Sequence, residues 1–178
     1  MTDDSTEMLA TLRCRLSQAP LWPFALALYA RPGIEAACLR LQDDAGVDVC
    51  ELLWRCWLLH HGAIPGPDGE AGLVEVRRWQ RGVTRPLRRL RRELKAAAAE
   101  SEGVARLRET LKRAELQAER EALARLEAVA MTRPLRPRDT GDPAPQELLS
   151  NALQLQKKAH LSTLNRLVSR LDPPWGPR

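Results

Sequence analysis

The chain has 178 residues, of which 44% are hydrophobic and 29% are charged, and its formal net charge is +5. This composition is typical of a globular protein and excludes an intrinsically disordered one. The sequence has no run of about 18 uncharged apolar residues, which a transmembrane helix would need. It begins with the acidic segment MTDDSTE, whereas a secretory signal begins with basic residues. We therefore expect no membrane-spanning helix and a cytoplasmic location.

The charge is distributed unevenly along the chain. Residues 1–70 contain five Arg against ten Asp or Glu, whereas residues 71–178 contain 23 basic against 13 acidic residues. The two halves could attract each other, or the second half could face an acidic partner. Arg outnumbers Lys 24 to 4. Arg binds phosphate and carboxylate groups bidentately, but codon bias in a GC-rich genome explains the same excess more simply.

Residues 21–62 hold most of the large apolar side chains. They include three of the five Trp, the only Phe, the only Tyr and three of the four Cys. Since burial of apolar surface stabilises a fold by roughly 25 cal/mol per Å², we expect this stretch to form the core. The Cys residues form no CxxC pair and are too sparse for a disulfide framework, so we expect reduced, buried thiols.

Four helices are predicted in the first part of the chain. The first spans residues 5–18, and a short second helix opens at Trp22-Pro23. The third spans residues 34–45 and stops at Gly46, where a positive φ costs little. Asp48 with Glu51 resembles a capping box at the start of the fourth. The buried stripes expected for the last three of these helices are Leu21, Phe24, Ala25 and Leu28; Ile34, Ala37, Cys38 and Leu41; and Val49, Leu52, Leu53, Cys56, Trp57 and His60.

A basic amphipathic helix is predicted after a short helix that begins at Leu73. Thr84 resembles an N-cap, followed by Pro86 in the first turn. Nine basic residues and one acidic residue lie between Arg77 and Lys95. At 100° per residue, Leu87, Leu90 and Leu94 share one side of this helix. The opposite side carries the candidate contacts for phosphate or an acidic partner, Arg85, Arg88, Arg89 and Arg92.

The last third of the chain predicts two more helices joined by a loop. Ser101 can cap a long amphipathic helix that reaches about Met131, with an expected stripe through Val104, Leu107, Leu111, Ala114 and Ala118 and then Ala122, Leu126 and Val129. Residues 132–145 contain four Pro and read as a flexible loop. A single helix is predicted over residues 146–171, followed by a tail with Trp175. No strand alternation is visible, so no sheet is expected.

Together these elements predict an all-α protein. A compact, aromatic-cored helical domain covers residues 1–82, and residues 83–131 supply the basic helix and the long amphipathic helix. Residues 132–145 form the Pro-rich loop, and residues 146–178 form the C-terminal helix and tail. We expect the longer helices to pack back as an antiparallel bundle.

The aromatic block also resembles a known sequence family. It reads W-x-F-A-L-x-L-Y, then P-G-I-x-x-A-C-L-x-L-Q-D, then G-x-D-V-x-x-L-L-x-x-x-W. This is similar to the opening of an uncharacterised family of small proteobacterial proteins with a conserved hypothetical domain of unknown function. The resemblance implies an all-helical fold in a bacterial cytoplasm, and it brings no activity, cofactor or catalytic residue. The expected core of this motif is Trp22, Phe24, Tyr29, Cys38, Trp54 and Trp57.

The sharpest candidate for chemistry is Cys56 with His60, four residues apart on one predicted helix. This spacing suits a metal-binding pair, but no second pair of ligands is evident. A nucleophile would also need an orienting group and an oxyanion pocket. A buried Cys and a His at the carbonyl end of a helix explain the pair more simply. We therefore expect no metal site, no cofactor, no catalytic residue and no enzymatic activity.

The function that the sequence favours is that of a non-enzymatic cytoplasmic adaptor or regulatory protein, which contacts another protein through its helix surfaces. The alternative is a nucleic-acid- or ribosome-associated protein that uses the basic stretch Arg77–Lys95, with Trp79 stacked on a base. We favour an internally paired or solvated basic face, because the acidic first half supplies counter-charge. Pairing of two copies through residues 101–131 is a further expectation. A membrane-surface role is less favoured, because the apolar face of that helix lacks aromatic residues.

Overall fold

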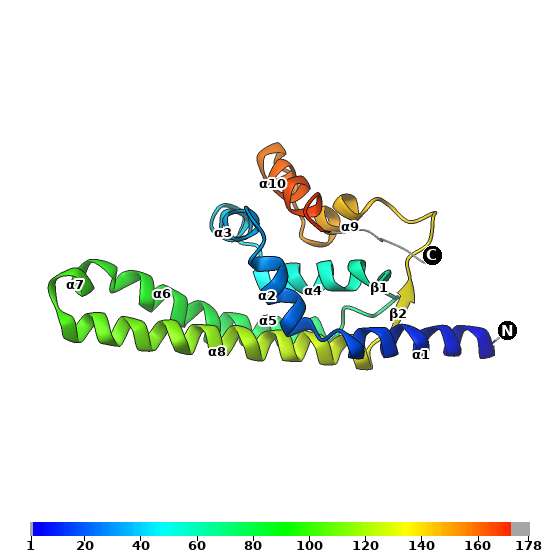
Figure 1. The fold of residues 1–178 in the computed structure, drawn as a ribbon, viewed down its shortest axis with the longest axis horizontal. Coiled ribbons are helices and arrows are strands. Elements are labelled where there is room, and N and C mark those ends of the chain that lie inside the picture. The colour runs from blue at the N-terminus through cyan, green and yellow to red at the C-terminus, as the bar shows by residue number, and fades with distance from the viewer. Residues whose placement is uncertain (1, 172–178) are drawn as a thin grey trace.

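The structure is a computed structural model that describes residues 2–171, and it consists of helices with one two-stranded ribbon (Figure 1). The prediction of an all-α fold with packed antiparallel helices is confirmed. Within these residues, no helix is long and apolar enough to cross a membrane. The predicted tail with Trp175 lies outside the described residues.

The elements follow one another closely along the chain. The helices are α1 (Thr2–Gln18), α2 (Leu21–Tyr29), α3 (Ile34–Ala45), α4 (Val49–His60), α5 (Leu73–Trp79), the π-helix η1 (Gln80–Thr84), α6 (Arg85–Glu93), α7 (Lys95–Glu100), α8 (Glu102–Thr132), α9 (Pro145–Ala152) and α10 (Lys158–Val168). The strands are β1 (Ala63–Pro65) and β2 (Leu135–Pro137).

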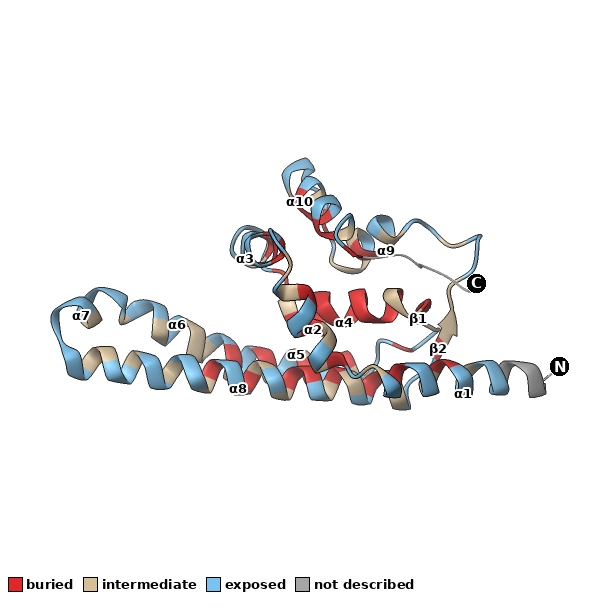
Figure 2. Ribbon diagram, viewed as in Figure 1, coloured by how far each residue is buried: buried red, intermediate tan, exposed pale blue. Residues whose placement is uncertain are grey.

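Helix α4 is the centre of the core. All ten residues from Cys50 to Leu59 are buried (Figure 2), as expected for a helix that is surrounded by other helices. Helices α2, α3, α8 and α9 pack around it. Trp57 is fully buried, and its indole Nε1 donates a hydrogen bond of 2.7 Å to the carbonyl oxygen of Ala19. The sequence predicted only one buried stripe for this helix, whereas the whole helix is enclosed.

Only half of the capping box predicted at the start of α4 forms. The carboxylate of Asp48 accepts a hydrogen bond of 3.1 Å from the backbone N–H of Glu51, which makes Asp48 the N-cap. The Glu51 side chain does not complete a capping box. It turns into the protein, where it binds Arg55 and Arg77.

The predicted N-cap at Thr84 is wrong, because no new helix begins there. Helices α5, η1 and α6 follow without a break, and the Arg85 N–H donates to the carbonyl oxygen of Gln80, five residues earlier. Pro86 follows directly, and a proline inside a helix lacks the N–H of an ordinary turn and crowds the carbonyl four residues before it. The wide π turn at this point lets the helix continue through Pro86.

Helices α6 and α7 fold back along α8 to form an antiparallel hairpin that extends beyond the rest of the molecule (Figure 1). Ser101 caps α8 as predicted, since its Oγ accepts from the Val104 N–H at 3.4 Å. The predicted stripe of α8 is correct at Ala118, Ala122, Leu126 and Val129, which are buried. It is wrong at Leu107, which is 50% exposed, because the projecting part of α8 has only α6 and α7 to pack against.

Two features that involve the C-terminal part of the chain differ from the sequence prediction. Strands β1 and β2 pair antiparallel, with Ile64 opposite Arg136, although no strand was expected. Each strand has only three residues, too few for a recognisable alternation. The single predicted helix over residues 146–171 is wrong, because the chain breaks after α9, with Gln154 at a φ of 55°, and restarts as α10 against α3.

One continuous buried cluster joins the segments that the sequence separated. It includes Leu16 of α1, Trp54 of α4, Leu126 of α8 and Leu164 of α10. The predicted boundary between residues 82 and 83 lies inside η1. Helices α8, α9 and α10 therefore pack on the same core as the helices before them, whereas α6 and α7 contribute no residue to it.

Stability is expected to fall between pH 6.5 and pH 4 because of His61. Burial, reinforced by His60 and Arg15, lowers the pKa of His61 from 6.5 to about 4. Between these values the unfolded chain binds a proton that the folded chain does not, so the stability present above pH 6.5 is lost as the pH falls. Urea unfolding of wild type and His61→Gln at pH 7 and pH 4.5 checks this. The wild type should lose more stability than the variant, and equal losses would contradict the assignment.

Candidate functional site

The projecting hairpin is held together by arginine–glutamate pairs between α6 and α8. The Nε of Arg88 donates to Glu115 at 2.8 Å and its Nη2 donates to Glu119 at 2.6 Å, while Arg91 binds Glu115 as well. Burial opposes the charge on Glu115, but Arg91 and Arg88 outweigh it and lower its pKa. At Glu119 burial dominates, and the pKa is raised in spite of Arg88. Arg88 therefore links α6 to two glutamates of α8.

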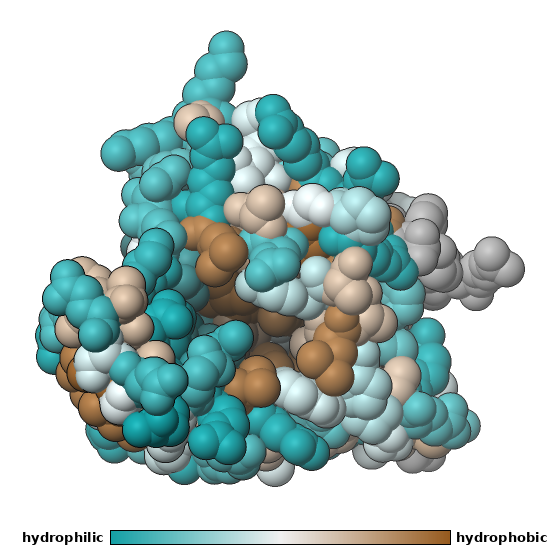
Figure 3. All heavy atoms as spheres, turned by 60° about the vertical axis from the view of Figure 1, so that its left-hand side comes forward, coloured by the Kyte–Doolittle hydropathy of each residue, from teal (hydrophilic) through white to brown (hydrophobic). Residues whose placement is uncertain are grey.

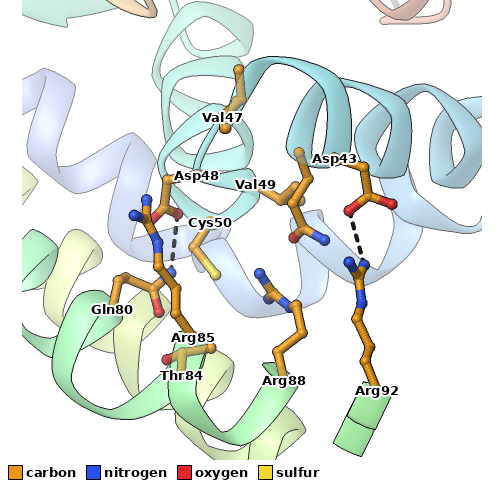
Figure 4. A pocket seen from close by; sticks show the side chains of 12 residues that line it. Asp43, Val47, Asp48, Val49, Cys50, Gln80, Thr84, Arg85, Arg88 and Arg92 are labelled. Atoms are coloured by element: carbon orange, nitrogen blue, oxygen red, sulfur yellow. Dashed lines mark hydrogen bonds and ion pairs between the residues drawn. The ribbon is translucent and has the colours of Figure 1, made fainter. Parts of the chain in front are cut away.

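Two further contacts join the body, by which we mean α2, α3, α4 and the loop of residues 46–48, to α6 and to η1, which leads into the hairpin. The Nη2 of Arg92 donates to Asp43 of α3 at 2.8 Å, and the Nε2 of Gln80 donates to Asp48 at 3.0 Å (Figure 4). The hydrogen bond from Arg92 is the largest effect on the pKa of Asp43, which is lowered. These contacts bridge the hairpin and the body at one end of the space between them.

That space is an open groove of about 590 Å³ between the body and the hairpin. Figure 3 shows it as a hollow floored by apolar residues and rimmed by hydrophilic ones. The apolar residues that line it are Trp22, Ala25, Leu26, Tyr29, Leu39, Val49, Leu53, Leu116 and Leu123. Leu26 is 51%, Leu39 is 39% and Leu116 is 54% exposed. Three different helices thus place exposed leucines around one depression.

A smaller polar pocket of about 320 Å³ continues the groove toward η1. The groove and this pocket share Gln42, Val49, Cys50, Arg88 and Arg92. Arg88 and Arg92 rise from α6 toward α3 and α4 (Figure 4). The groove therefore has an apolar floor and a polar end.

Trp22 and Tyr29 line the groove and are only partly buried in the core. Both are half-buried, as is Phe24, whereas Cys38, Trp54 and Trp57 are completely buried. The Trp22 ring lies 5.2 Å from the guanidinium carbon of Arg120, and burial raises the pKa of Tyr29 to about 12. The expected family-motif core is thus divided, with three residues inside the protein and three at its edge.

The structure brings together three of the four candidate arginines. Arg85, Arg88 and Arg92 line the polar pocket, whereas Arg89 is exposed and lies 3.9 Å from Glu93 of its own helix. Arg88 and Arg92 are already engaged by carboxylates of this chain. Arg85 makes no ion pair with another described residue.

Cys56 lies inside the core, and His60 lies against an aromatic ring. Cys56 is completely buried, and burial raises the pKa of its thiol. The His60 ring lies against Phe24, with 5.4 Å between the ring centroids. Within residues 2–171, no group of three or more His, Cys, Asp or Glu side chains is placed to hold a metal ion.

The groove leucines are the residues that the sequence analysis missed. Leu26, Leu39 and Leu116 all fall outside the buried stripes predicted for their helices, so the sequence alone assigns them no role. The sequence does contain a signal for them: each of these three helices has a leucine on the face that is expected to be exposed to water. Only folding brings these three faces together.

The sequence pattern of the DUF2390 family, described as proteins of unknown function, matches residues 20–126. The chain belongs to the DUF2390 family. This identification agrees with the resemblance to an uncharacterised family in the aromatic block. No curated protein matches the chain, and no solved structure matches it.

The DUF2390 region contains the whole groove. Its lining residues run from Trp22 to Leu123, and the polar pocket lies between them in sequence. Helix α1, strand β2 and helices α9 and α10 lie mainly or wholly outside the matched region. The family pattern therefore covers the body and the hairpin together, which are the two walls of the groove.

Proposed function

We propose that this DUF2390 protein is a non-enzymatic adaptor that binds an amphipathic helix of a partner protein in the groove between the body and the hairpin. The observation that carries the proposal is the convergence of Leu26, Leu39 and Leu116, each more than a third exposed, on one apolar depression. Contiguous exposed apolar surface with a polar rim is typical of a protein interaction site.

A helix is the ligand that suits this groove. An amphipathic helix presents a continuous apolar stripe with charged residues on both sides, and binding of such a helix in an apolar groove is a recurrent mode of recognition. The floor offers leucine and aromatic side chains to the stripe. The walls offer charged side chains to its flanks, including Glu35 on the body and Arg113 on the hairpin.

The contacts of the basic stretch support protein binding over the nucleic-acid alternative. Six of the nine basic residues between Arg77 and Lys95 form ion pairs with carboxylates of this chain. Phosphate contacts to them would compete with these carboxylates. The indole of Trp79 donates to Ala118 at 3.0 Å, and one face of its ring meets Arg125 at 4.3 Å, so it is not a free platform for a base. The cytoplasmic location and pairing of copies through residues 101–131 stay predictions.

Peptide selection tests the proposal directly. Random peptides displayed on phage are selected on the full chain, and the enriched peptides are then measured against the double variant Leu26→Asp, Leu116→Asp. We expect enriched sequences with apolar residues at i, i+3 or i+4, and i+7. Their affinity should fall at least about tenfold on the variant, because two desolvated aspartates would face the apolar stripe.

The matched control is the double variant Leu90→Asp, Leu107→Asp. These leucines are 44% and 50% exposed, and neither lines the groove, so this variant should bind the selected peptides as the wild type does. The adaptor proposal fails if no peptide is enriched, if the enriched peptides lack helical spacing, or if both variants bind equally well.

A further inference from the structure

The two sides of the groove and of its polar pocket, the body and the hairpin, carry opposite charges. Within the described residues, every charged side chain that the body contributes to the lining is acidic: Glu35, Asp43 and Asp48. The hairpin contributes six cations, Arg85, Arg88, Arg91, Arg92, Lys112 and Arg113, against three Glu. The apolar floor thus lies between an acidic wall and a mainly basic wall.

This polarity persists after the internal ion pairs are taken into account. Two of the three hairpin glutamates, Glu115 and Glu119, are bound by Arg88 and Arg91. Arg92 binds Asp43 across the groove. Three cations of the hairpin lining, Arg85, Lys112 and Arg113, form no ion pair with another described residue. The remaining acidic residue of this lining is Glu109. On the body side, Glu35 likewise has no ion-pair partner among these residues.

We infer that the groove selects a partner helix whose two flanks are oppositely charged, with the acidic flank along the hairpin and the basic flank along α3. This inference rests on the proposed function, and it names the partner that the function requires. Complementary charges at the rim of an interface add modest affinity each, but they discriminate between partners and fix orientation. A helix with both flanks basic would meet Lys112 and Arg113, and one with both flanks acidic would meet Glu35.

Three designed peptides test the inference. Each is a helix of about five turns with the same leucine stripe, and the flanks carry Glu on one side and Lys on the other, Glu on both, or Lys on both. Binding to the full chain is measured by isothermal titration calorimetry at low salt. The split-charge peptide should bind about tenfold more tightly than the Lys-only peptide, which corresponds to two or three rim ion pairs with the hairpin. It should bind about threefold more tightly than the Glu-only peptide, because Glu35 is the acidic residue that the body contributes to the groove among the described residues.

A charge-reversed variant makes the test specific to the hairpin wall. Exchange of the two flanks of the peptide is no control, because a helix can turn end for end in a groove. The double variant Lys112→Glu, Arg113→Glu instead gives both walls exposed acidic groups, and the preference should move to the peptide with Lys on both flanks. Lys112 and Arg113 are exposed, so the fold should be unaffected. The variant Arg81→Glu, Lys95→Glu makes the same charge change outside the groove and should keep the wild-type order.

The outcomes separate this inference from the function on which it rests. All three peptides could bind equally well and all bind more weakly to the variant Leu26→Asp, Leu116→Asp. The groove would then bind helices without discriminating between their charges, and only the inference would be wrong. An unchanged preference on Lys112→Glu, Arg113→Glu would also overturn it. If none of the peptides binds, the inference and the proposed function both fail.

Discussion

Replacement of Glu51 by Gln is expected to lower the free energy of unfolding by about 2–3 kcal/mol, because it removes the buried carboxylate that two arginines share. The buried Arg55 then keeps only its ion pair with Glu70, at 2.8 Å, among the described residues. Glu51 and Arg55 are each only 5% exposed. The Oε1 atom of Glu51 accepts hydrogen bonds of 2.8 Å from both Arg55 and Arg77, and its Oε2 atom accepts one of 3.0 Å from Arg77. Burial opposes the charge on Glu51, yet the two arginines keep its pKa below the ordinary value.

A surface pair on α5 provides the control. Glu75 binds Arg78 at 2.7 Å, but both side chains are about two-thirds exposed, at 65% and 67%. Pairs of this kind contribute at most about 1 kcal/mol, so Glu75→Gln should change stability little. Urea unfolding at pH 7 measures both variants. If Glu51→Gln costs no more than Glu75→Gln, the buried cluster is not what holds α4 and α5 together.

Replacement of Trp57 by Ala is expected to cost about 3–5 kcal/mol through the cavity that it leaves in the core. Trp57 has no exposed surface, and the carbonyl of Ala19 loses the hydrogen bond from its indole as well. That contact joins α4 to the segment between α1 and α2. The expected result is a large shift of the urea midpoint with loss of α1 packing.

Trp22 provides the matched comparison for Trp57. It is only half-buried, at the wall of the groove, so Trp22→Ala should cost at most about 2 kcal/mol. The same variant should weaken binding of the peptides selected on the groove, whereas a core residue would act only through stability. Equal loss of stability in the two variants would show that Trp22 belongs to the core after all.

The sequence predicted best those features that depend on neighbouring residues. Helix α3 spans the predicted residues 34–45, and Gly46 ends it with a φ of 68°. Asp48 and Ser101 cap their helices as expected. These are local effects of capping and backbone conformation, which act within one or two turns and do not require the rest of the fold.

The errors arose where distant segments meet. The apolar pattern of α8 did not reveal that its first part would project beyond the body, and so Leu107 was expected to be buried. Strands β1 and β2 are 70 residues apart in sequence, and each is stable only because the other pairs with it. Glu51 was expected to serve the helix start, but the approach of Arg77 from α5 made it the centre of a buried ion cluster.

By itself, the sequence determined that this protein is helical, that residues 21–62 supply the centre of its core and that its basic stretch includes an amphipathic helix, because periodicity and composition are properties of the chain alone. Only the tertiary structure decided what these faces do. The fold brings Leu26, Leu39 and Leu116 from three helices to one groove and uses most of the basic stretch for internal ion pairs. It also sets an acidic wall opposite a basic one, since the position of one helix against another depends on packing between residues far apart in sequence.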